Sequence, residues 1–270
     1  SLKKSLSLAL GDENDKISDI SLKLISKIHI MNNGHATCEV FTCLTHHLMD
    51  IFQESQHRQL DDGLNVTEEN NQKIFKKFRL LCEFLHEIPS YWLRYHERFV
   101  EDILESSLSL LSLGNNHYGL SSFNAIISPL HYLAILDPKA SWFKKWMHGY
   151  YSRKSVVEQL KRHPSLLIDT IQHCMEFASI SKSLLPFDML EDDDGVDSLT
   201  KPEGHDCYSF HQLDYIYFVH SLCLLGRLLL YKDSRELFPV ILPSTDDPVT
   251  TTDLVVAFIE IMSARYSNFN

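Results

Sequence analysis

A compact group of possible zinc ligands lies at His205, Cys207 and His211. Imidazole nitrogen and thiolate sulfur are donors that zinc prefers, so this spacing could supply three ligands. A closed structural zinc site needs a fourth ligand, and none follows at a familiar spacing. The simpler interpretation places one histidine in an acidic loop and another at a helix start. We therefore expect no metal and no cofactor, and we keep as an alternative a small metal-dependent or regulatory enzyme that uses these residues.

Other catalytic signatures are absent from the sequence. No serine lies on a glycine-flanked elbow, no cysteine lies in a recognisable catalytic motif, and no glycine-rich phosphate-binding loop occurs. Cys43 and His47 share a helix face with an apolar stripe, which favours packing in the core over ligation. The sequence therefore predicts that the protein is not an enzyme.

Aromatic and basic residues concentrate between Trp142 and Lys154. Tryptophan, tyrosine and arginine dominate binding hot spots, which is one interpretation of this segment. The other is that Trp142, Trp146 and Tyr150, at i, i+4 and i+8, form the buried face of one helix. We favour the core for the tryptophans. The cations of the segment are then expected to form an exposed basic surface for an acidic partner: Lys144, Lys145, Arg153 and Lys154.

The elements that would position these residues are helices, one after another. Apolar residues recur at helical spacing, and no stretch of comparable strength alternates as a strand would. Glycine and proline are both scarce, at 9 each, which also favours long helices. The expected helices cover 15–31, 36–52, 73–88, 97–113, 121–136, 165–181, 208–231 and 252–266, with shorter ones between Pro138 and Pro164.

Each expected helix has a stripe that we expect to be buried. In the helix 15–31 the stripe is Ile17, Ile20, Leu24, Ile28 and Met31. The helix 73–88 should bury its apolar face, end at Pro89 and turn Lys77 outward with the neighbouring cations. Residues 53–66 are polar and should form a loop.

Composition excludes several classes of protein. The 270 residues carry a net charge of −11, so a nucleic-acid partner is not expected. No apolar run is long enough to span a membrane. The six cysteines lack paired spacing, which indicates free thiols in a reducing compartment, the cytosol or the nucleus. Because the chain begins at Ser1, we expect an excised segment of a longer protein.

A chain of amphipathic helices must bury each stripe against its neighbours. We predict an all-α fold, an irregular armadillo- or HEAT-like α-solenoid of stacked helical hairpins, with a plain helical bundle as the alternative. One domain should cover 1–270. Residues 186–206 hold eight acidic residues and one lysine, so they should form a mobile loop that is dispensable for folding.

Several stretches carry a family resemblance. Residues 12–24, residues 77–93 and, above all, the tryptophan segment 142–153 resemble the Broad-minded (BROMI) proteins, TBC-domain relatives that act in cilia. The resemblance covers most of 10–185 and is weaker after 186. The chain lacks the arginine and glutamine fingers of active TBC domains, which excludes GTPase-activating chemistry from this segment.

The resemblance implies a function that the residues alone do not. It implies a non-catalytic scaffold in primary cilium assembly and Hedgehog signalling, located in the cytoplasm at the cilium or basal body. It also implies protein partners, among them a cell-cycle-related kinase that controls ciliary length. A helical-repeat adaptor unrelated to cilia remains the other interpretation.

Overall fold

The computed structural model describes residues 2–31, 34–58, 68–91, 97–113, 128–183, 210–243 and 247–266. Almost all of these residues are helical, with one pair of two-residue strands among them, which confirms the predicted all-α class. The chain divides into two compact units, 1–167 and 168–270, which are described separately. The solenoid, and the single domain over 1–270, remain predictions.

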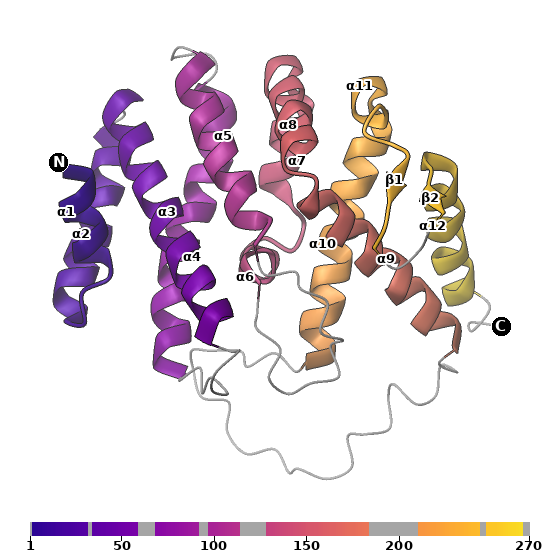
Figure 1. Cartoon of the computed structure of the whole chain (residues 1–270), viewed down its shortest axis with the longest axis horizontal. Helices are drawn as coiled ribbons and strands as arrows, with labels where there is room; N and C mark the ends of the chain where they lie inside the picture. The colour runs from indigo at the N-terminus through magenta and orange to yellow at the C-terminus, as the bar shows by residue number, and fades with distance from the viewer. Residues whose placement is uncertain are drawn as a thin grey trace, which may run out of the picture. The chain divides into compact units, whose positions relative to one another are not determined.

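The first unit is built around one long helix (Figure 1). Helix α3 contacts α1, α2, α4 and α5, while α4 also contacts α6 and α7, and α8 contacts α5 and α7. The bounds of these helices are α1 (Leu2–Leu10), α2 (Asp15–Met31), α3 (Gly34–Arg58), α4 (Glu68–Tyr91), α5 (Glu97–Leu111), α6 (Pro129–Leu136), α7 (Ser141–His148) and α8 (Tyr150–Arg162).

The second unit begins within α9, and the first residues of that helix belong to the first unit. Its helix α9 contacts α10 through aromatic rings, with Phe177 stacked on Phe218 at 4.1 Å between centroids. A short antiparallel pair joins Val240 to Val249. The elements are α9 (Ser165–Ser183), α10 (Phe210–Leu230), α11 (Lys232–Arg235), β1 (Val240–Ile241), β2 (Pro248–Val249) and α12 (Thr251–Tyr266).

The core of the first unit uses the apolar stripes that helical spacing predicts for α3, α4 and α5. Leu44 and Leu48 of α3, Leu85 of α4 and Leu104 of α5 are fully buried. Aromatic rings join the helices, with Phe41 packed edge-on against Phe84 at 5.1 Å. For these three helices, periodicity identified the packed face correctly.

Some predicted boundaries are wrong. Helix α3 extends to Arg58, so the first part of the predicted loop 53–66 is helical. Helix α4 continues through Pro89 to Tyr91. Proline has no N–H for the carbonyl of Leu85 four residues earlier, and that carbonyl accepts a hydrogen bond from the Trp146 indole instead. Helix α1 was not predicted at all. Helix α6 begins at Pro129 and covers the second part of the expected helix 121–136, with the proline at the first helical position, where it is favoured.

The predicted mobile loop 186–206 lies outside the described residues. Among the helices that are described, none has both the length and the apolar character required to cross a membrane.

Candidate functional site

The tryptophan segment forms two helices rather than one. Trp142 and Trp146 are fully buried, which confirms the prediction that they belong to the core. The indole Nε1 of Trp146 donates a hydrogen bond of 2.8 Å to the carbonyl of Leu85. Tyr150, however, is 60% exposed, so its predicted place on the buried face is wrong. The extended backbone of Gly149 separates α7 from α8 and interrupts the helical phase between Trp146 and Tyr150.

The predicted basic surface is distributed over α7 and α8. Lys144, Lys145 and Lys154 are exposed, and the Lys145 Nζ lies 3.5 Å from the carbonyl of His86. Arg153 is half-buried, and its guanidinium donates to the carbonyl of Met147 at 3.2 Å. Part of the Arg153 charge is therefore used within the chain, while the role of these cations in partner binding stays a prediction.

Helix α2 packs with a face that lies about 100° around the helix from the one that its periodicity indicates, because the buried residues directly follow the predicted ones in the sequence. Its buried residues are Ser18, Ser21 and Ile25. The Ser18 hydroxyl donates to the carbonyl of Leu10 at 3.1 Å, which ties α2 to α1. Small serine side chains let neighbouring helices approach closely, and α2 contacts both α1 and α3.

The predicted stripe of α2 therefore faces outward. Of its five residues, four are 40–79% exposed, and we call these four the α2 stripe: Ile17, Ile20, Leu24 and Met31. The fifth, Ile28, is half-buried. The exposed lysines of α2 lie along one side of this stripe at helical spacing: Lys16, Lys23 and Lys27. Contiguous exposed apolar residues with a polar border are typical of protein-interaction sites.

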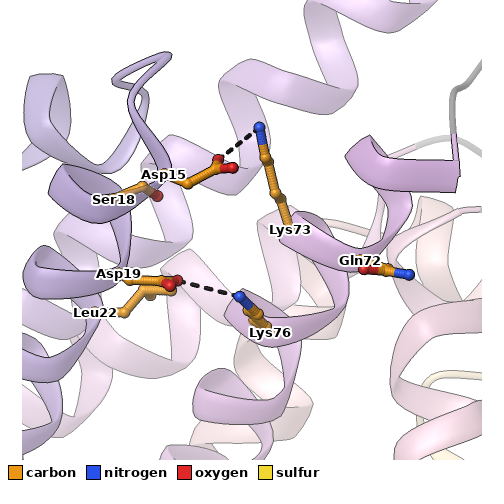
Figure 2. A pocket seen from close by; sticks show the side chains of 7 residues that line it. All are labelled: Asp15, Ser18, Asp19, Leu22, Gln72, Lys73 and Lys76. Carbon is orange, nitrogen blue, oxygen red and sulfur yellow. Dashed lines mark hydrogen bonds and ion pairs between the residues drawn. The ribbon is translucent and has the colours of Figure 1, made fainter. Parts of the chain in front are cut away.

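A pocket of about 220 Å³ lies between α2 and α4 (Figure 2). The lysines that line it reach toward aspartates: Lys73 Nζ lies 2.7 Å from Asp15, and Lys76 Nζ lies 3.3 Å from Asp19. Since these charges neutralise one another, the pocket offers little net attraction for a charged ligand. We interpret it as a polar seam between two helices.

A second polar contact joins α3 to α4 below the surface. The Lys77 Nζ lies 2.8 Å from His47 Nε2, and both residues are buried, so the predicted outward position of Lys77 is wrong. Burial, and then the charge of Lys77, lower the pKa of His47 to about 4. Burial, and then the charge of Lys73, lower the pKa of Lys77 to about 8. Cys43 is buried on the same helix, as predicted.

Three groups that could ligate a metal converge in the first unit. Cys82 Sγ, a ring nitrogen of His86 and a carboxylate oxygen of Asp137 lie within 4.8 Å of one another, the one such cluster found among the described residues. His86 Nε2 lies 3.1 Å from Asp137 Oδ2. Burial, followed by the charges of Asp137 and Glu83, raises the pKa of Cys82 to about 12, so the thiol carries its proton near neutral pH.

Sequence reasoning missed this cluster because Asp137 is distant in the sequence from α4. The available signal was the i, i+4 spacing of Cys82 and His86, which places both side chains on one helix face. The predicted zinc candidates behave differently: His205 and Cys207 lie outside the described residues, and His211 falls within α10 at a position whose side chain is not described.

The comparisons with known proteins agree with one another. The family described as "Broad-minded protein central region" matches residues 1–269. The mouse protein named "Protein broad-minded" is 36% identical over 262 residues, which cover 96% of this chain and 20% of the mouse protein. The zebrafish protein of the same name is 34% identical over 272 residues, with 97% and 21% covered. The chain thus spans about one fifth of the length of these curated relatives. No solved structure matches the chain.

Proposed function

The chain belongs to the Broad-minded family, and we propose that it serves as a non-catalytic protein-interaction module of a ciliary protein. Its role, as the resemblance implies, lies in primary cilium assembly and Hedgehog signalling, in the cytoplasm at the cilium or basal body. The partner complex contains a cell-cycle-related kinase. An irregular α-solenoid of stacked helical hairpins is the architecture we propose for it, since such arrays present long binding surfaces.

The observation that carries this proposal is the α2 stripe. Large aliphatic side chains such as Ile20, 64% exposed, and Met31, 79% exposed, gain free energy when another surface removes them from water. The stripe follows one face of a single long helix. This shape matches the recognition mode in which an amphipathic helix lays its apolar face against another apolar surface.

The charges beside the stripe specify its occupant. Lys16, Lys23 and Lys27 lie on the same exposed side of α2, so a partner helix with acidic residues along its flank complements them. We therefore assign the stripe to an amphipathic, acidic-flanked helix of a partner protein.

The test is capture of the kinase from ciliated cells by the tagged chain. The wild-type chain should retain the kinase, and the double change Ile20→Ser and Leu24→Ser should reduce the retained amount at least about tenfold, as expected for the loss of more than 1.4 kcal/mol of binding free energy. Val256→Ser is the matched control, because Val256 is an exposed apolar residue of α12 outside the stripe.

The two parts of the proposal fail separately. A folded wild-type chain that does not retain the kinase contradicts the kinase assignment. Equal retention by the wild-type chain and the stripe variant contradicts the assignment of the contact to α2. Helical circular dichroism of each variant establishes that the chain is folded in either case.

A further inference from the structure

We propose that Cys82, His86 and Asp137 bind one zinc ion that joins α4 to the junction between α6 and α7. The proposal concerns a site other than the α2 stripe and is independent of the interaction role. It rests on the donor types, on their convergence from two separate segments, and on the contacts that orient the aspartate.

The separation of the three donors suits a zinc ion. Zinc holds nitrogen and oxygen ligands at about 2.0–2.2 Å and sulfur at about 2.3 Å, so tetrahedral ligands lie roughly 3.3–3.8 Å from one another. The donors of this cluster all lie within 4.8 Å, and His86 Nε2 is already 3.1 Å from Asp137 Oδ2. Rotations about side-chain bonds that move the donor atoms by about an ångström bring their separations to those of a tetrahedral zinc site.

Two of the ligands come from one rigid element. Cys82 and His86 are four residues apart on α4, so the helix holds both side chains on one face. Two histidines at the same spacing supply the zinc ligands of helical metalloprotease motifs. A site on a helix fixes the mutual geometry of its ligands better than a loop does.

The third ligand is oriented by the start of α7. Asp137 Oδ1 accepts a hydrogen bond of 3.0 Å from the Ser141 hydroxyl, and Oδ2 accepts one of 3.2 Å from the backbone N–H of Trp142. Such contacts of a ligating carboxylate are the outer-shell interactions that hold metal ligands in place. Each carboxylate oxygen retains acceptor capacity for a cation.

The types of ligand indicate which metal binds, and the solvent exposure of the cluster indicates how its coordination is completed. One thiol, one imidazole and one carboxylate suit zinc, whereas magnesium and calcium prefer oxygen ligands alone. Cys82 is 8% exposed, and the His86 side chain is 29% exposed, so the cluster reaches solvent on one side. A water molecule can therefore complete a four-coordinate zinc, and binding releases the thiol proton of Cys82.

The first experiment uses Co²⁺ as a spectroscopic substitute for zinc on the full chain without a histidine tag. We expect one Co²⁺ per chain, an absorption band from charge transfer between thiolate and cobalt, and displacement of the cobalt by one equivalent of zinc. The band should be absent in Cys82→Ser. Cys174→Ser is the matched control, because Cys174 is also a buried cysteine and belongs to the second unit.

The thiolate band distinguishes the proposed site from weak binding of cobalt by histidines elsewhere, because the chain has 15 histidines and binding by histidine alone gives no thiolate band. A wild-type chain without the band, or a band that persists in Cys82→Ser, overturns the proposal.

The second experiment keeps the test independent of the cysteine substitution. His86→Gln changes a half-exposed residue, and Asp137→Asn preserves the shape of the side chain beside α7. Each should weaken zinc binding by more than about 100-fold, because even changes to outer-shell partners cost 10–100-fold. Zinc should raise the Tm of the wild-type chain and of Cys174→Ser but not of these two variants. An equal rise in Tm in all four proteins contradicts the site.

Discussion

Trp146 shows how one side chain links two helices of the first unit. Its ring is fully buried, lies 5.0 Å from the ring of Trp142, and donates its N–H to the carbonyl of Leu85 on α4. The residue therefore contributes buried apolar area and also satisfies a backbone acceptor of another helix. The neighbouring Lys144 and Lys145 remain in solvent on the same helix.

We expect Trp146→Ala to lower the free energy of unfolding by roughly 3–5 kcal/mol, because it leaves a cavity and an unpaired carbonyl. Urea unfolding followed by circular dichroism measures this change. Lys144→Ala is the control and should alter stability by less than about 0.5 kcal/mol. A Trp146→Ala protein that melts within about a degree of the wild type contradicts the core assignment.

The burial of His47 beside Lys77 makes stability depend on pH. The pKa of His47 is lowered from 6.5 to about 4 in the folded chain, so the unfolded chain binds the proton more tightly. Stability from this residue is therefore complete above pH 6.5 and is lost as the pH falls from 6.5 to about 4. At pH 5 the loss relative to pH 7 should be about 2 kcal/mol.

His47→Gln should remove this part of the pH dependence. Urea unfolding of the wild type and the variant at pH 7 and pH 5 gives the difference directly. His148→Gln is the matched control, since His148 is exposed. If His47→Gln loses as much stability between these pH values as the wild type, the titration assigned to His47 is wrong.

At the scale of an element, α2 shows that a sequence can predict where a helix forms without predicting which of its faces packs. Its bounds, Asp15–Met31, agree with the bounds predicted from periodicity. Four of the five residues expected to be buried are nevertheless exposed, and the buried residues are Ser18, Ser21 and Ile25 instead. The hydrophobic period identified the helix, while the neighbouring helices selected the packed side.

Adjacent residues of α2 test this orientation. Ile25 is fully buried and Leu24 is 44% exposed. We expect Ile25→Ala to cost roughly 2–5 kcal/mol and Leu24→Ala less than about 1 kcal/mol, because only the first substitution creates a cavity. Thermal and urea unfolding of the two single variants measures both changes. The reverse order of stability contradicts the orientation of α2.

At the scale of the whole molecule, the largest fully buried side chains lie in the first unit, among them Trp142, Trp146, Phe41 and Phe84. A unit with its own hydrophobic core can fold alone. We expect residues 1–167 to give helical circular dichroism, native-like tryptophan fluorescence and one cooperative unfolding transition. A fragment that is unfolded or that unfolds without cooperativity contradicts the independence of this unit.

The sequence by itself determined the local structure. Helical spacing, scarce glycine and proline, and the absence of strand patterns predicted an all-α chain and most of its helices, since these signals act over a few neighbouring residues. The i, i+4 spacing of Cys82 and His86 is a local signal of the same kind. The tryptophans at i and i+4 likewise indicated a packed face.

Only the tertiary structure decided which groups meet across helices. It turned the α2 stripe outward, buried Lys77 against His47, exposed Tyr150 after the break at Gly149, and brought Asp137 to Cys82 and His86. Periodicity indicates that a helix has an apolar face, but which face packs in the core depends on the shape and charge of segments distant in the sequence. Those long-range contacts have no signature within a local stretch of sequence, so the candidate site could not be assembled from it.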